Sequence, residues 1–321
     1  MGSEGAPTLA ETGEFALLER IAAQHRGSPE VLIGIGDDAA AIQASRGPIL
    51  ICVDMLVEGR HFRRDWSSAI EIGQRAAAAS LADIAAMGGR SLALVVGFAA
   101  PADLPTHWAL ECDAGLSQEA NRAGASVVGG DVSRADAVII SVTALGTVDD
   151  GEPVRRSGAR VGDVIAVCGR LGHAAAGLAI LRRGFRAPKA LVDAYRVPEP
   201  PYKLGVKARI AGATSMIDVS DGLIADARHI ALASGVVLDL DRERLKVPDA
   251  LVETAAAYSM DPLEWVLTGG DDHALLATFP AGTRLPSGFT KIGEVHEGQA
   301  GVTLNGASIA APGGHEHFRR E

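Results

Sequence analysis

Residues 49–54 read Ile-Leu-Ile-Cys-Val-Asp, a short apolar run that ends on a carboxylate. A bounded run of apolar and β-branched residues predicts a buried strand. The chain continues into residues 68–87, an Ala-rich segment with a Ser68-x-x-Glu71 capping box at its start and two glycines beyond its end, which predicts a helix. Strand-like and helix-like segments alternate in this way, and the alternation predicts a mixed α/β (α+β) fold.

The same patterns recur along the rest of the chain. A second helix is expected over residues 223–234, where apolar residues follow helical spacing up to Gly235, a typical helix stop. Further strands are expected at residues 92–98, 125–128, 137–145, 164–167, 215–219 and 236–240.

A turn-rich stretch at residues 149–153, Asp-Asp-Gly-Glu-Pro, ends a run of expected strands and precedes a basic patch. Such a stretch is typical of a domain boundary. At about 150 residues per domain, the 321 residues also suggest two domains. We therefore expect an N-terminal domain over residues 1–150 and a C-terminal domain over residues 151–321.

The composition excludes several classes of protein. Hydrophobic residues make up 47% of the chain and charged residues 22%, which is unlike a disordered chain. The net charge of −10 argues against a nucleic-acid-binding surface. No apolar run is long enough to span a membrane, the N-terminus does not resemble a signal peptide, and the three cysteines are widely spaced. We expect a cytoplasmic protein with no nucleic-acid or membrane partner.

Aspartates recur where strand-like runs end. A carboxylate at a strand end of an α/β protein projects into the crevice where such folds bind ligands. One Asp-Gly junction by itself is more simply a turn or a helix cap, but five of them favour a shared site. The five junctions carry Asp37 and Asp38, Asp54, Asp131, Asp218 and Asp221, and Asp271 and Asp272.

Carboxylates crowded into one site repel one another unless cations separate them. Oxygen ligands select hard cations, and magnesium also binds substrate phosphates. An acidic protein can therefore hold a nucleoside triphosphate if metal ions supply the positive charge. Asp83 lies within the helix expected at residues 68–87, and its pattern fits a solvent-facing position and a cleft-facing position equally well.

Several common catalytic motifs are absent from the sequence. It contains no Gly-x-x-x-x-Gly-Lys-Ser/Thr, which excludes a P-loop kinase, and neither His-Glu-x-x-His nor Gly-x-Ser-x-Gly. Residues 34–39 match the loose dinucleotide pattern Gly-x-Gly-x-x-Ala. We discount that match because two aspartates would face the pyrophosphate.

Nine short sequence motifs occur in order along the chain. They include Gly-Ile-Gly-Asp-Asp at residues 34–38 and Ile-Asp-Val-Ser-Asp-Gly-Leu-Ile at residues 217–224. The others are residues 13–15, 54–62, 81–88, 129–131, 156–163, 268–272 and 317–318. Together they resemble the thiamine-monophosphate kinase family, within the larger group related to aminoimidazole ribonucleotide synthetase. The resemblance implies two α/β domains similar to that synthetase and a homodimer formed through the sheets of the N-terminal domains.

The reaction implied by the resemblance is magnesium-dependent transfer of the ATP γ-phosphoryl group to thiamine monophosphate, giving thiamine diphosphate. Several magnesium ions and ATP as co-substrate are implied with it. Because the attacking group is already a phosphate oxygen, no general base is needed, and catalysis depends on positioning and charge neutralisation. We therefore assign no catalytic acid or base.

The motif match also implies the site residues. The metal ligands would be Asp38, Asp54, Asp83, Asp131, Asp218 and Asp221, with Cys52 and Val53 contributing backbone carbonyls. ATP would be bound by Gly130, Asp131, Arg156 and Ser220. Thiamine monophosphate would be bound by His61, Asp271 and His315. Without the family, His61 would be interpreted as a surface histidine and Arg156 as an exposed arginine.

The sequence departs from the family pattern mainly on the acceptor side. Cys52 and Val53 stand where the family usually has Ser and Thr. Where the family has Gly-Glu-Asp-Tyr-Glu, this chain has Gly-Asp-Asp-His-Ala at residues 270–274, and His315 replaces an aromatic residue. ATP and magnesium binding are therefore better supported than the identity of the acceptor.

Two alternatives stay open at this point. One is another ATP-using enzyme of the same group, an amidine-forming ligase or a selenophosphate-type synthetase, although the reactive cysteines expected of these are missing. The other is a non-catalytic regulator that binds a nucleotide or cation.

Overall fold

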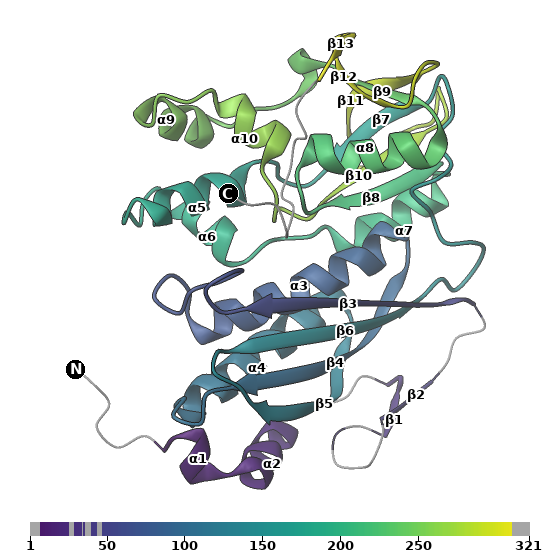
Figure 1. Cartoon of the computed structure of the whole chain (residues 1–321). Helices are drawn as coiled ribbons and strands as arrows, with labels where there is room; N and C mark the ends of the chain where they lie inside the picture. The colour runs from purple at the N-terminus through teal and green to yellow at the C-terminus, as the bar shows by residue number, and fades with distance from the viewer. Residues whose placement is uncertain (1–6, 26–28, 34, 36–39, 44–46, 310–321) are drawn as a thin grey trace. The chain divides into compact units, whose positions relative to one another are not determined.

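The computed structural model describes residues 7–25, 29–33, 35, 40–43 and 47–309, without the side chains of residues 14 and 15. The chain divides into two compact units (Figure 1). The first comprises Met1–Ile84 and Arg90–Gly151, and the second comprises Ala85–Gly89 and Glu152–Glu321. The mixed α/β fold in two parts is confirmed; the functional roles expected of residues 1–150 and 151–321 stay predictions. In the described part of the chain, no helix is both long and apolar enough to cross a membrane.

The first unit is built on a four-stranded sheet in the order β3-β6-β4-β5. Its strands are β3 (Ile49–Val57), β6 (Ile139–Thr147), β4 (Arg90–Ala100) and β5 (Ser126–Arg134). β6 pairs antiparallel with both of its neighbours, and β4 pairs parallel with β5. The helices are α1 (Leu9–Thr12), α2 (Glu14–Gln24), α3 (Ala69–Ala86) and α4 (Thr106–Ala123), and a small hairpin joins β1 (Val31–Ile33) to β2 (Ala41–Ile42).

The helix expected at residues 68–87 is confirmed as α3. Its predicted capping box is present: Ser68 Oγ accepts from the backbone N–H of Glu71, and a Glu71 carboxylate oxygen accepts from the backbone N–H of Ser68 at 2.7 Å. This helix lies against one face of the sheet, since Ser80 Oγ is 3.0 Å from the carbonyl oxygen of Val142 in β6.

The prediction that strands end at Asp54 and Asp131 is wrong. β3 continues to Val57, and β5 continues to Arg134. Asp54 pairs with Val142 of β6, and Asp131 pairs with Gly97 of β4. Cross-strand pairing thus carries both strands through a residue type that strands otherwise disfavour.

Because side chains alternate along a strand, β3 has two different faces. Leu50 and Leu56 are buried on the side of α3, and Cys52 and Asp54 share that face. The opposite face presents four exposed apolar side chains, with exposed fractions from 43% to 68%: Ile49, Ile51, Val53 and Met55.

The second unit is built on a seven-stranded sheet in the order β13-β12-β9-β11-β7-β10-β8. All pairs are antiparallel except β12 with β9. The strands are β7 (Val164–Cys168), β8 (Ser215–Val219), β9 (Val237–Leu240), β10 (Ala274–Phe279), β11 (Thr290–His296), β12 (Gly301–Leu304) and β13 (Ala307–Ser308).

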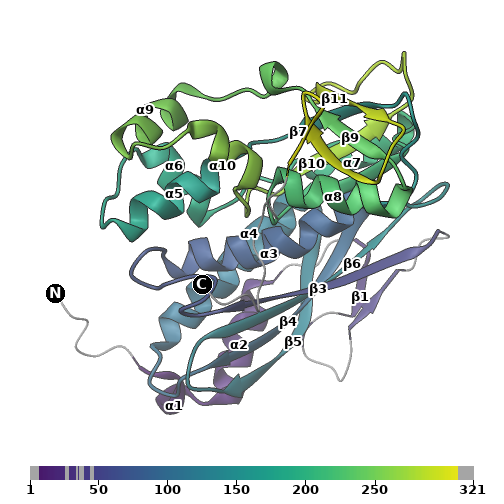
Figure 2. The ribbon, with the colours of Figure 1, turned by 45° about the horizontal axis from the view of Figure 1, so that its top comes forward.

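One set of helices of the second unit forms a group beside its sheet (Figure 2). The grouped helices are α5 (His173–Arg182), α6 (Lys189–Arg196), α9 (Asp249–Ala257) and α10 (Pro262–Thr268). The others are α7 (Tyr202–Ile210), α8 (Leu223–Ser234) and the short 3-10 helix η1 (Arg242–Arg244). The helix expected at residues 223–234 is confirmed as α8, and left-handed Gly235 ends it.

Asp271 and Asp272 do not follow a strand as expected. The apolar residues before them end α10, and the two aspartates come just before β10. Asp261 caps this helix by accepting from the backbone N–H of Leu263, and Pro262 occupies its first turn. An Asp-Pro pair is a helix start signal, and it overrides the strand-like run that follows.

Helices α3 and α4 approach one another closely at two glycines. A Cβ at Gly115 would lie 2.1 Å from the carbonyl oxygen of Ile70, and one at Gly73 would lie 2.0 Å from that of Cys112. The backbone of either helix can make room for a Cβ only if the whole helix moves, so this helix crossing requires glycine at both positions.

We expect Gly115→Ala to lower the free energy of unfolding by at least about 2 kcal/mol, because the added methyl group forces the two helices apart. Urea denaturation followed by circular dichroism would measure the loss. Gly97→Ala is the matched control, since its Cβ would meet nothing nearer than 3.6 Å. Equal stability of the two variants would contradict the proposed close packing.

Candidate functional site

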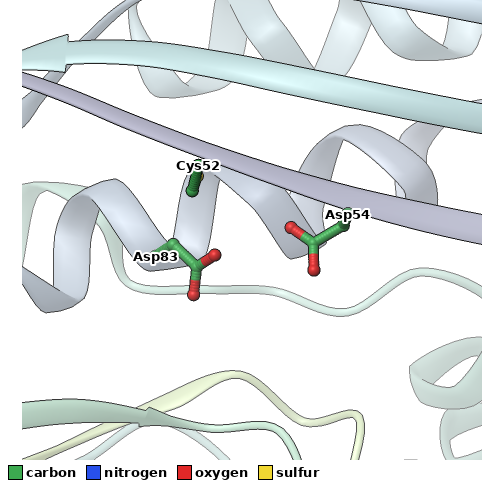
Figure 3. Close-up of side chains that lie close together, drawn as sticks. All are labelled: Cys52, Asp54 and Asp83. Carbon is green, nitrogen blue, oxygen red and sulfur yellow. The ribbon is translucent and has the colours of Figure 1, made fainter.

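Each unit carries a group of acidic side chains, and we describe the two groups separately. In the first unit, β3 presents Cys52 and Asp54 toward α3, which presents Asp83 (Figure 3). One ligand atom from each of the three lies within 4.8 Å of the others. Two positions that are far apart in the sequence, Asp54 and Asp83, thus supply carboxylates to one place.

Ser80 holds the carboxylate of Asp54. Its Oγ lies 2.8 Å from Oδ2 of Asp54, and the serine is fully buried. Ser80 is not among the residues predicted from the sequence. Its spacing of three residues from Asp83, which places both on one face of a helix, is the signal that could have identified it.

Cys52 contributes a neutral thiol to this group. Burial, followed by the negative charges of Asp83 and Asp54, raises the pKa of the thiol well above its ordinary value. The Sγ donates to the backbone carbonyl of Ser80 at 3.2 Å. Because the thiolate is the form that binds metals, the carboxylates are the stronger ligands here. The side chain of Val53 lies on the opposite face of β3 and is 63% exposed, so only its backbone carbonyl could take part. That role stays a prediction.

Gly130 and Asp131 are exposed residues of β5, and both line a pocket walled by α2 and α4. Leu18 and Leu116 are among its apolar lining residues. A Cβ at Gly130 would lie 2.1 Å from the carbonyl oxygen of Val96 in β4. The strand therefore requires glycine at this position, whatever ligand it meets.

A buried histidine joins the two helices of this pocket. His25, which ends α2, has Nε2 2.9 Å from a carboxylate oxygen of Asp113 and Nδ1 3.1 Å from Oγ of Ser117, both on α4. Asp113 also lines the pocket. These contacts fix one wall of the pocket relative to the other.

His61 lies in the turn that follows β3. Its Nδ1 accepts from the backbone N–H of Val57 at 2.9 Å, so the neutral ring carries its proton on Nε2. The histidine is half-buried and not simply a surface residue. Of the other predicted residues in the N-terminal half, Asp38 lies outside the described residues.

In the second unit, acidic groups gather at the end of β8. Asp218 is buried within that strand, and Asp221 follows it. Asp226, on α8, accepts from the backbone N–H groups of Asp221 and Gly222 at 3.0 and 3.1 Å. Asp221, Asp226 and the exposed His229 each place a possible ligand atom within 4.8 Å of the others. Asp221 does not cap α8. The N-cap residue of this helix is Gly222, and no side chain forms a capping hydrogen bond.

The charges at this strand end affect one another. Burial, followed by the charges of Asp218 and Asp221, raises the pKa of Asp226 to about 7. Asp226 is not among the residues predicted from the sequence, although it lies only two residues beyond the segment 217–224 that contains Asp218 and Asp221. Ionising all of these carboxylates together is unfavourable, and a bound cation would stabilise their ionised forms.

The remaining predicted residues either do not belong to the two acidic groups or lie outside the described residues. Arg156 is exposed, and its carbonyl accepts from Oγ of Ser234 at 3.2 Å. Ser220 is half-buried, and its carbonyl accepts from the backbone N–H of Asp271 at 2.8 Å. Asp271 has a left-handed φ of 65° and stands in the short loop before β10. His315 lies outside the described residues.

The donor sets of both groups fit magnesium. They consist mainly of carboxylate oxygens, which are hard ligands, and the nearby thiol is neutral. Asp54 and Asp83 could hold a cation in the first unit, and Asp221 with Asp226 and His229 could do so in the second. The pairing of Asp218 with Asp221 at one ion stays a prediction.

Asp272 is a buried acid with a different role. Its Oδ1 accepts from the backbone N–H of Ala174, in the first turn of α5, at 3.0 Å. Its Oδ2 has no hydrogen-bond partner among the described residues. Burial raises the pKa of Asp272 to about 7, against an ordinary value of 3.8, although the N–H groups of Ala174 and Gly172 oppose the rise.

This raised pKa predicts a pH dependence of stability. As the pH rises from about 4 to about 7, the unfolded chain loses this proton while the folded protein keeps it, so stability falls, by up to about 4 kcal/mol. Asp272→Asn should lack this fall and gain stability relative to the wild type between pH 4 and pH 8. Thermal unfolding across that range measures it, with Asp136→Asn as the control at an exposed position. A difference that stays constant with pH would contradict the assignment.

Relatives of known name resemble this chain over nearly its whole length. The thiamine-monophosphate kinase of Mycobacterium tuberculosis is 46% identical over 313 residues, which are 97% of this chain and 93% of that protein. The thiamine-monophosphate kinase of Corynebacterium glutamicum is 38% identical, covering 90% of this chain and 88% of the relative.

Solved structures resemble the fold in the same way. One described as AaThiL complexed with AMPPCP and TMP has a TM-score of 0.80 at 31% identity and covers 98% of this chain and 100% of that one. Thiamine-monophosphate kinase from Stenotrophomonas maltophilia has a TM-score of 0.82 at 34% identity, covering 92% of this chain and 98% of that one. The hydrogenase maturation protein HypE, at 19% identity and a TM-score of 0.69, shares the fold.

The family models match both halves of the chain. The N-terminal domain of AIR synthase related proteins matches residues 36–148, and the C-terminal domain of these proteins matches residues 160–304. These matches and the identity to named relatives show that the chain belongs to the AIR synthase related family, in its thiamine-monophosphate kinase branch.

Proposed function

We propose that this protein transfers the γ-phosphoryl group of ATP to thiamine monophosphate, giving thiamine diphosphate and ADP. The observation that carries the proposal is the 46% identity to a thiamine-monophosphate kinase over 97% of the chain. The carboxylates of Asp54 and Asp83, brought together from β3 and α3, support it independently.

Magnesium bound by these carboxylates would neutralise the phosphate charge and orient the phosphoryl group. The acceptor is a phosphate monoester, which is largely ionised at pH 7 and needs no base to remove a proton. The protein's own task is therefore to hold rigid ligands in place. Ser80 does this for Asp54 through a buried hydrogen bond of 2.8 Å.

Nucleotide binding is assigned to the pocket beside Gly130 and Asp131. Its apolar wall from α2 and α4 suits a flat base, and Asp131 stands at its edge. Arg156 and Ser220 are assigned to the phosphates, and an arginine offers paired N–H donors for that purpose. Binding of thiamine monophosphate is assigned to His61, Asp271 and His315. His61 would use Nε2, because its Nδ1 already accepts from the backbone N–H of Val57.

The direct assay incubates the protein with ATP, magnesium and thiamine monophosphate and follows thiamine diphosphate and ADP by chromatography. We expect equal amounts of the two products. Asp54→Asn should reduce turnover at least 100-fold, because it removes a charge that holds the metal, with little change in thermal stability. Asp65→Asn, at an exposed position, is the matched control.

The outcomes separate the alternatives. ATP binding without product would favour a nucleotide-binding regulator, and ADP formation that needs a different acceptor would favour another enzyme of the group. Normal turnover by Asp54→Asn would overturn the metal assignment.

We also propose that the protein is a homodimer formed through the open face of the N-terminal sheet. Ile51 is 68% exposed and Met55 is 55% exposed, and both lie in a row on β3, an edge strand in the described part of the sheet. A row of large apolar side chains on a rigid strand is typical of a buried interface. Thr143 and Val95 continue this face onto β6 and β4.

Ile51→Glu should convert the dimer to a monomer at micromolar concentration, because each copy would bury an unpaired charge. Light scattering coupled to gel filtration gives the mass directly. Ile210→Glu, at a position 73% exposed in the second unit, should leave the dimer intact. A monomeric wild type would overturn the proposal.

A further inference from the structure

A buried histidine contacts Asp218, one of the carboxylates assigned to magnesium. Nδ1 of His273 lies 2.9 Å from Oδ2 of Asp218, and the two side chains are 7% and 5% exposed. An ionised carboxylate can only accept hydrogen bonds, so Nδ1 carries a proton and donates it to Asp218. The contact therefore sets both the protonation of the ring at Nδ1 and the direction of the bond.

The backbone leaves His273 little freedom to move away from this contact. Its N–H donates to the carbonyl oxygen of Val219 at 2.9 Å, and its φ is 52°, in the left-handed region. The next residue, Ala274, pairs with Val219 as β10 begins beside β8. A left-handed conformation persists at such a residue only where the surrounding structure holds it. His273 is therefore held to β8 at two points. Its backbone N–H bonds to Val219, and its side chain bonds to Asp218.

The surroundings of Asp218 explain why it needs such a partner. Asp221 lies three residues after Asp218, and a carboxylate oxygen of Asp221 lies within 4.8 Å of one of Asp226. A carboxylate under repulsion from two neighbours turns away from them unless a hydrogen bond holds it. His273 supplies such a bond to Oδ2 of Asp218.

We propose that His273 is a positioning residue for a divalent cation: its Nδ1–H fixes the carboxylate of Asp218 so that Asp218 and Asp221 present their oxygens to one ion. The inference rests on the proposed function for the identity of these ligands. Partners of this kind orient metal-binding side chains, and their loss typically costs about 10–100-fold in metal affinity.

The test measures binding of Mn²⁺, as a probe for magnesium, by the loss of the free-ion signal in electron paramagnetic resonance, with the ATP analogue AMPPCP present. His273→Ala removes the donor and should raise the Kd for Mn²⁺ about 10-fold. His273→Asn keeps an N–H near the position of Nδ1 and tolerates a left-handed backbone, so it should restore most of the affinity. His296→Ala, at an exposed histidine of β11, is the matched control.

A double-mutant cycle separates positioning from general damage to the fold. In an Asp218→Asn background the carboxylate is gone, and we expect His273→Ala to cost no further affinity for Mn²⁺. Thermal unfolding of every variant shows which ones are folded. If His273→Ala does not fold, His273→Asn decides: affinity near that of the wild type supports the proposal, and a 10-fold loss overturns it.

Other outcomes against the proposal are equally direct. A wild-type Kd for His273→Ala, or the same loss in both backgrounds, would show that His273 does not act through Asp218. Failure of the wild type to bind Mn²⁺ would also overturn it. A wild type that binds Mn²⁺ but transfers no phosphate to thiamine monophosphate would overturn the proposed function and leave the cycle valid.

Discussion

Carboxylates held close together by rigid backbone are the constraint on which the rest of this structure depends. Asp54 and Asp83 meet because a paired strand and a buried helix fix them, and Asp218, Asp221 and Asp226 crowd the end of β8. Burial, followed by the like charges of Asp218 and Asp221, raises the pKa of Asp226, so a further negative charge is unfavourable there. A hard divalent cation offsets this repulsion and can also bind a phosphate, so an acidic protein becomes suited to ATP.

Small local interactions keep these carboxylates in place. Ser80 forms a hydrogen bond to Asp54, and His273 forms one to Asp218. Asp226 accepts from the backbone N–H groups of Asp221 and Gly222. Ser80 and His273 each come from an element other than the one that carries the carboxylate. Folding therefore brings each hydrogen-bond donor and its carboxylate together.

Local signals in the sequence were interpreted correctly where a few neighbouring residues decide the outcome. The capping box of Ser68 and Glu71 and the stop at Gly235 are both present, because each depends on residues within one turn. The strand boundaries at Asp54 and Asp131 were wrong because pairing with β6 and β4, which a single segment does not reveal, extends both strands. Ser80 and His273 were not predicted because their importance lies in contacts with residues far away in the chain, Asp54 and Asp218.

The sequence by itself determined the α/β class, the aspartate motifs and the resemblance to one family, since composition, spacing and motif order are properties of the linear chain. The tertiary structure alone decided that Asp83 joins Asp54, that Val53 faces away from both, and that His273 bonds to Asp218. The physical reason is that strand alternation and strand register, not separation along the chain, determine which side chains share a face.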